Sequence, residues 1–179
     1  MQKIEIPLSK LKLILMFIGC NLFIVLSVNF AINPEKFISY VFRNVDFIRI
    51  FGIISSILCS VAWIYFPAKL FDKKPGLILD EKGIIDNSSA VSVGQILWKD
   101  IVSIRTEKIR STKFLIINVN NSEQYLERSS KLNRILLKAN MKMYETPITI
   151  SSTGLKCNFE NLEKLIEKEF NNYKKKPNR

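Results

Sequence analysis

The residues most capable of chemistry in this sequence are three cysteines and a loose group of carboxylates. The cysteines are Cys20, Cys59 and Cys157. A catalytic thiol needs an adjacent base, and histidine, the commonest base, is absent from the chain. Cys20 and Cys59 lie in long apolar runs, where a thiol behaves as a small apolar group, and Cys157 lies in an expected strand, where we expect it in the core rather than as a nucleophile. The three are also too scattered for a zinc site or a disulfide framework.

The carboxylates that lie nearest one another in the sequence are Asp80, Glu81, Asp86 and Asp100. Asp80 and Glu81 separate two short apolar segments, and Asp100 stands where another begins, so turn formation accounts for them. The sequence contains no Gly-rich phosphate loop and no spacing of metal ligands. We therefore expect a protein without enzymatic activity, metal or cofactor. A pair of catalytic carboxylates within this group is the alternative.

Basic residues at intervals of three and four indicate binding rather than catalysis. They are Arg128, Lys131, Arg134, Lys138 and Lys142. On one helix they would form a single stripe, beside an apolar stripe of Leu132, Ile135, Leu136, Ala139 and Met143. Near a bilayer, each basic residue contributes on the order of 1 kcal/mol of attraction to anionic headgroups, and Lys73 and Lys74 would add to it. The alternative is a solvated helix face whose apolar side packs on a sheet.

The chain as a whole is strongly basic. Its 179 residues include 27 Lys plus Arg against 16 Asp plus Glu, a formal net charge of +11. Such an excess attracts either nucleic acid or an anionic membrane surface. Two long apolar runs favour the membrane, because basic residues commonly flank membrane spans. We therefore expect a lipid bilayer as partner, and no nucleic acid.

The two runs without charge cover residues 13–32 and 50–68. A helix needs roughly 20 such residues to cross the hydrocarbon layer. The first run is longer than the apolar core of a cleaved signal peptide, and no small-residue cleavage site follows it. Two buried helices of a soluble core are the alternative. The spacing Gly52-Ser56-Ser60 predicts a small-residue face that contacts either the other span or another subunit.

Basic residues also predict the orientation of the spans. Six lie on the outer flanks, namely Lys3, Lys10, Lys12, Lys69, Lys73 and Lys74, against Lys36, Arg43 and Arg49 in the connection. Because Lys and Arg are favoured in short cytoplasmic loops, both termini are expected in the cytoplasm.

After residue 74 the pattern changes to short strands followed by helices. Strands are expected at 77–79, 83–85, 95–98, 101–106, 114–119 and 147–150, the last able to pair with 155–157. Short links between consecutive strands indicate an antiparallel sheet. Trp98 ends one strand and is expected in the core rather than as an exposed anchor for a partner. Helices are expected at 124–128, 130–143 and 158–173, the last clearly amphipathic.

Five segments carry a resemblance to a known family. They are Ile4-Glu5-Ile6-Pro7-Leu8-Ser9-Lys10, Pro75-Gly76-Leu77 with Gly83-Ile84, Gly94-Gln95-Ile96-Leu97-Trp98-Lys99-Asp100-Ile101, Tyr125-Leu126-Glu127-Arg128 and Thr146-Pro147-Ile148-Thr149-Ile150. In these the chain resembles a family of uncharacterised bacterial membrane proteins, in which a two-helix membrane hairpin precedes a pleckstrin-homology-like (PH-like) domain. The resemblance covers nearly the whole chain and implies architecture rather than activity. The helices expected before Pro147 depart from a minimal PH plan.

We therefore expect a membrane α-hairpin over residues 1–74 and an α+β, PH-like domain over residues 75–179, with an antiparallel sheet closed by a C-terminal amphipathic helix. The hairpin would lie in the bacterial inner membrane, with the domain in the cytoplasm. The expected function is a non-enzymatic interaction module that contacts anionic lipid headgroups or a protein partner. An immunity or accessory protein that binds a specific toxin or membrane-complex subunit is the alternative. The expected contact residues are Arg128, Lys131, Arg134, Lys138, Lys142, Lys73 and Lys74.

Overall fold

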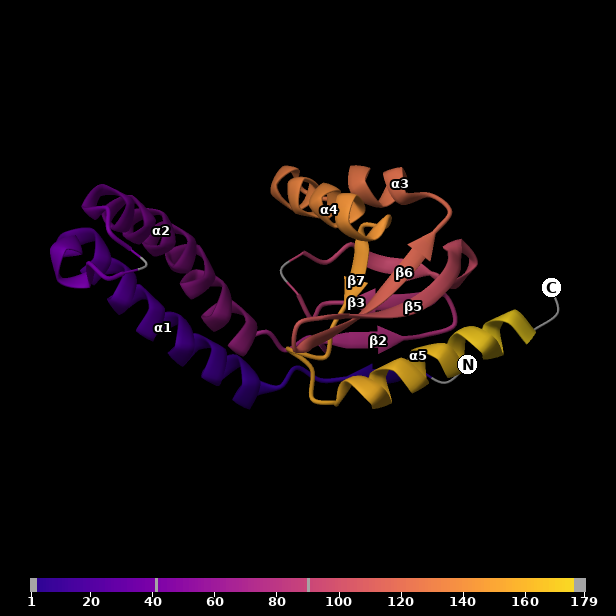
Figure 1. Cartoon of the computed structure of the whole chain (residues 1–179). Helices are drawn as coiled ribbons and strands as arrows, with labels where there is room; N and C mark the ends of the chain where they lie inside the picture. Colours follow the sequence, from indigo (N-terminus) through magenta and orange to yellow (C-terminus); the bar gives the residue numbers. More distant parts are fainter. Residues whose placement is uncertain (1–2, 41, 90, 176–179) are drawn as a thin grey trace. The chain divides into compact units, whose positions relative to one another are not determined.

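The computed structural model describes residues 3–40, 42–89 and 91–175 (Figure 1). The chain divides into two compact units. Residues 10–73 form a helical hairpin, and the segments before and after it together form a sheet domain.

The helical hairpin consists of α1 (Lys10–Ile32), a 3-10 turn η1 (Pro34–Phe37) and α2 (Val45–Leu70). Asn44 caps α2 by accepting a hydrogen bond from the backbone N–H of Phe47 at 3.1 Å. The two helices contact one another through polar groups as well as apolar ones. Trp63 Nε1 donates to Asn21 Oδ1 at 3.2 Å, and Cys20 Sγ donates to the backbone carbonyl of Cys59 at 3.3 Å.

Within the described residues, α1 and α2 are the helices long and apolar enough to cross a membrane. Few of their side chains are buried, so most of their apolar surface faces outward; Leu22, Phe23 and Ile64 are examples. A core helix of a soluble protein would bury most of this surface. Exposure of an apolar patch of this size to water is energetically unfavourable. Length, composition and exposure therefore favour a membrane location for the hairpin.

The first sheet of the domain has the strand order β1-β2-β3-β4, with every pairing antiparallel. Its strands are β1 (Ile4–Ile6), β2 (Leu77–Leu79), β3 (Gly83–Asp86) and β4 (Gly94–Leu97). The expected hairpin turn joins β2 to β3. Asp80 forms this turn by accepting hydrogen bonds from the N–H groups of Lys82 and Gly83 at 2.8 and 3.0 Å.

The second sheet has the order β5-β6-β7, and a C-terminal helix packs on the core. Its strands are β5 (Ile101–Ile109), β6 (Thr112–Val119) and β7 (Ile148–Ile150), and the helix is α5 (Phe159–Lys175). A 3-10 turn η2 (Trp98–Asp100) connects the two sheets. Trp98 is buried there, donates from Nε1 to the carbonyl of Asp80 at 2.8 Å and stacks on Phe170 of α5. Trp98 is thus a core residue, as expected.

Two expectations, one about the boundary of this domain and one about its strand pairing, were wrong. Residues 4–6 belong to the sheet domain rather than to the hairpin unit, because the alternation Ile4-Glu5-Ile6 forms a strand whose Ile6 is buried against β2. Residues 155–157 do not pair with β7. Instead Leu155 forms a bridge with Leu8, and the N–H of Lys156 donates to the carbonyl of Pro7 at 2.9 Å. The N-terminal segment therefore occupies the place expected for a local hairpin.

Candidate membrane-contact site

Four of the basic residues expected to bind, Lys131, Arg134, Lys138 and Lys142, lie on the second of two helices inserted between β6 and β7. These are α3 (Ser122–Glu127) and α4 (Lys131–Tyr144), and Figure 1 shows them on the side of the sheets away from α5. Ser130 caps α4 by accepting from the N–H of Asn133. At the other end, Glu145 adopts a left-handed conformation with φ 65°, and Arg105 Nη2 donates to the carbonyl of Tyr144 at 2.8 Å. Both ends of α4 are thus fixed by the domain.

Tyr125 anchors the shorter helix to the sheets. Its hydroxyl donates to Asp100 Oδ2 at 2.9 Å and accepts from the N–H of Leu97 at 3.2 Å, and the side chain is fully buried. Burial, together with the hydrogen bond to Asp100, raises the pKa of Tyr125 to about 12. The neutral phenol therefore ties α3 to the junction between β4 and β5.

Tyr125→Phe is expected to destabilise the domain by about 1–3 kcal/mol, because it leaves buried polar groups without their partner. The folded-state pKa lies above the unfolded value of about 10. The contribution of Tyr125 is therefore fully present below pH 10 and is lost as the pH rises toward 12. The measurement is urea unfolding of the detergent-solubilised wild type and of the Tyr125→Phe variant between pH 10 and 12. The difference between their free energies of unfolding should shrink as the pH rises. A constant difference would contradict this assignment.

Three of the expected contact residues form one line on α4. Lys131, Lys138 and Lys142 are exposed, and their spacing of seven and four places them on the same face. The helix carries no acidic residue between positions 131 and 144. We call these three residues the lysine line. They present positive charge that no carboxylate of the same helix offsets.

The other four expected residues do not belong to this line. Arg134 is on α4, but its guanidinium turns to the end of α3 and donates to the carbonyls of Leu126 and Glu127, both at 3.1 Å. Arg128 is exposed but lies beyond the end of α3, because the helix breaks before Ser130. Lys73 and Lys74 are exposed in the connection between α2 and β2. Arg134 therefore positions α4 rather than facing outward.

The apolar stripe of α4 does not pack on the sheet, so the alternative, a solvated helix whose apolar side packs on the sheet, is wrong. Leu132, Ile135 and Met143 are 70%, 68% and 66% exposed, and Leu136 is 44% exposed. Leu137, on the opposite face, is completely buried instead. The apolar stripe therefore lies directly beside the lysine line on the outer face of the helix.

An open groove of about 550 Å³ follows the inner edge of the lysine line. It is lined by Glu123, Leu126, Lys138, Ala139, Met141 and Lys142. Two of these side chains are ammonium groups one helical turn apart, three are apolar, and Glu123 is a carboxylate.

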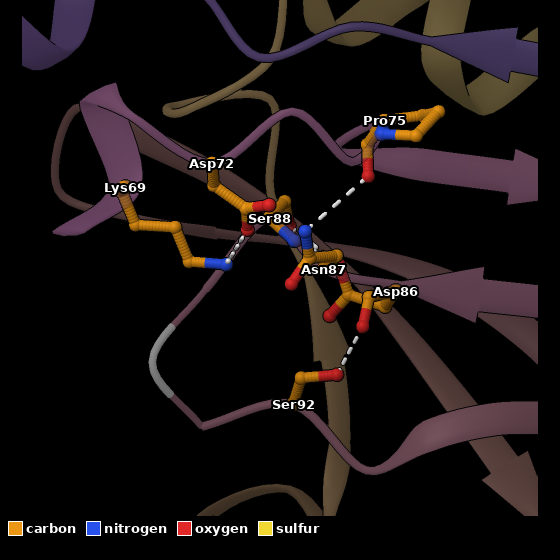
Figure 2. Close-up of polar contacts among 7 residues, drawn as sticks. All are labelled: Lys69, Asp72, Pro75, Asp86, Asn87, Ser88 and Ser92. Atoms are coloured by element: carbon orange, nitrogen blue, oxygen red, sulfur yellow. Dashed lines mark hydrogen bonds and ion pairs between the residues drawn. The ribbon is translucent and has the colours of Figure 1, made fainter.

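Three of the carboxylates considered for catalysis, Asp80, Asp86 and Asp100, accept hydrogen bonds from other groups of the domain. Asp86 Oδ1 accepts from the N–H and hydroxyl of Ser88 at 2.8 and 2.6 Å, and Figure 2 shows the surrounding loop. The hydroxyl of Ser92 donates to the backbone carbonyl of Asp86. In the hairpin, Lys69 Nζ lies 3.4 Å from Asp72 Oδ2 (Figure 2). Among the described residues, no group of His, Cys, Asp and Glu side chains could hold a metal ion.

Comparison with known proteins adds no assignment to this geometry. No family model, no curated protein and no solved structure matches the chain. The outer face of α4 and the two long apolar helices are therefore the features of this chain that bear on its function.

Proposed function

We propose that this chain is a membrane-anchored, non-enzymatic interaction protein whose sheet domain contacts anionic lipid headgroups at the cytoplasmic face of the bacterial inner membrane. The observation that carries the proposal is the lysine line, Lys131, Lys138 and Lys142, exposed on a helix without acidic residues. Clusters of lysines attract anionic lipids at about 1 kcal/mol per residue. Arg128, Lys73 and Lys74 add positive charge to the same chain.

The sheet domain is, in this proposal, a PH-like module. The succession of four antiparallel strands, three antiparallel strands and a C-terminal helix supports it. The pair α3 and α4 is an insertion between β6 and β7, which gives this domain a binding face that the minimal plan lacks.

The pairing of β1 with β2 supports two crossings of the membrane by the hairpin. Ile4 lies opposite Leu79, and Ile6 lies opposite Leu77, so the segments before α1 and after α2 meet in one sheet. This pairing supports a location of both segments on the same side of the membrane, and hence an even number of crossings. The six basic residues on this side, against three in the connection, favour the cytoplasmic side.

Only Pro7–Ser9 separate β1 from α1, a reach of about 10 Å when fully extended. A domain tethered so closely encounters the headgroups at high effective concentration. Weak contacts by individual lysines are therefore sufficient for a stable association with the surface.

The proposal is tested by the reactivity of lysine amines in the full chain, reconstituted in nanodiscs of phosphatidylcholine with or without phosphatidylglycerol. A water-soluble amine reagent and mass spectrometry give the labelling rate of each lysine. Three contacts of about 1 kcal/mol each raise the association constant of the domain for the anionic surface about a hundredfold. Labelling of the lysine line should therefore be at least tenfold slower in anionic discs. Lys164 and Lys168 of α5 are matched controls, exposed and also four residues apart.

The result expected is protection of Lys131, Lys138 and Lys142 in anionic discs only, and this protection should weaken at about 1 M salt, where the Debye length is about 3 Å. Equal labelling of α4 and α5 in both lipids would overturn the proposal. Protection of α4 that does not depend on lipid charge would favour the alternative, an accessory protein whose partner covers this face.

A further inference from the structure

We propose that α4 inserts the apolar stripe Leu132, Ile135, Leu136, Ala139 and Met143 into the boundary between the headgroups and acyl chains of an anionic bilayer. This inference rests on the proposed function and deepens it, because headgroup contact by the lysine line requires no insertion. The occupant of the apolar stripe is lipid, rather than a second copy of the chain or another protein.

The exposure of the apolar stripe needs an explanation. Single exposed leucines are common on soluble proteins, but here several large apolar side chains share one helix face. The helix has a second face, centred on Leu137, that already packs on the domain. The apolar stripe therefore does not contribute to the core of the domain, and its exposure favours a role in binding a partner surface.

The charges beside the apolar stripe identify that surface. Successive residues of a helix are 100° apart, so Lys131, Lys138 and Lys142 fall within one narrow sector, and the apolar stripe occupies the adjoining sector. Helices with apolar residues on one side and lysines along its border lie in the plane of a membrane interface. Lysine stems can extend from such a position to the phosphates while their methylenes remain among the lipids.

The apolar stripe is held ready by the domain and does not require the membrane to form. Ser130 caps the start of α4, Arg105 binds its last turn, and Arg134 ties it to the end of α3. Isolated amphipathic helices lose conformational entropy when they fold on a bilayer. Because α4 is already ordered, this loss is avoided, and the association gains affinity.

The test places an environment-sensitive fluorophore on Ile135→Cys in the full chain, with Cys20, Cys59 and Cys157 replaced by serine. The protein is reconstituted in nanodiscs containing phosphatidylglycerol, with lipids brominated along the acyl chain as quenchers. The matched control carries the fluorophore at Lys164→Cys on α5. We expect blue-shifted, bromine-quenched emission at position 135 and aqueous emission at position 164.

Each other outcome is decisive. Aqueous emission at position 135, with the lysine line still protected by anionic lipid, would overturn insertion and leave the proposed function standing. Aqueous emission without lysine protection would remove both. A blue shift without bromine quenching would show that protein covers the apolar stripe, and dependence on the number of chains per nanodisc would identify a second copy.

A double variant, Leu132→Ser with Ile135→Ser, tests the same inference without a probe. Both residues are exposed, so the domain should retain its fold. At about 1 M salt the wild-type lysine line should keep several-fold protection through insertion, and the variant should lose it. Equal salt sensitivity of the two proteins would contradict insertion.

Discussion

Gly83→Ala is expected to destabilise the sheet domain by about 3 kcal/mol or more. A Cβ atom at this position would overlap the carbonyl oxygen of Ile96 and lie 2.9 Å from the Cα of Leu97. These are backbone atoms of β4, which pairs directly with β3 at this point. Because the overlapping atoms belong to the backbone, no side-chain rotation can relieve the overlap. A shift of the β4 backbone would break the β3–β4 hydrogen bonds that position Trp98.

The measurement is urea unfolding of the detergent-solubilised chain, followed by Trp98 fluorescence in a Trp63→Phe background. Gly94→Ala is the matched control, at the other end of the same strand pair. Nothing lies within 4 Å of its Cβ position, but φ is +74°, so a cost of about 1–2 kcal/mol is expected from conformation alone. Equal costs at the two positions would refute the steric explanation.

Gly52→Val is expected to separate the two helices of the hairpin. Its Cβ would lie 2.6 Å from the backbone N of Ala31 and 2.7 Å from the backbone O of Ser27. Overpacking of this kind costs about 1–3 kcal/mol, and small residues are what allow membrane helices to approach closely. Ser60 of the same spacing is exposed, so the contact depends on Gly52 rather than on the whole row.

The two native thiols of the hairpin report this separation. Cys20 Sγ lies 3.3 Å from the carbonyl oxygen of Cys59, so mild oxidation in a Cys157→Ser background should join the two by an intramolecular disulfide. Gly52→Val should lower its rate of formation about tenfold, the equivalent of about 1.4 kcal/mol. Gly19→Val, with nothing within 4 Å of its Cβ position, should leave the rate unchanged. A rate unaffected by Gly52→Val would place the contact elsewhere.

The elements that the sequence predicted correctly are those whose signal is local. The apolar runs match α1 and α2, the turn at Asp80 joins β2 to β3, and the three-and-four spacing of Phe159, Leu162 and Ile166 marks the buried face of α5. The strand β1 was missed because three residues carry little pattern, and its partner Leu77–Leu79 lies beyond the whole hairpin. No local rule connects segments so far apart.

The candidate site was predicted in composition but not in orientation. The spacing of the basic and apolar residues located both stripes on α4, yet it did not show which face the domain covers. That choice depends on Leu137 and on distant groups, Arg105 of β5 and the carbonyl of Leu126. Arg134 was assigned to the binding face because helical spacing does not reveal that its guanidinium binds the carbonyl of Leu126, eight residues earlier in the chain.

The position of β1 also sets an order of events during synthesis. The strand Ile4–Ile6 leaves the ribosome first, and Leu77–Leu79 follows only after both helices of the hairpin have been made. At about 5–20 residues per second, the delay is roughly 4–15 seconds. During that time β1 has no partner, and the sheet can close only when the hairpin is complete. A closed sheet therefore forms only in chains whose hairpin has been fully translated.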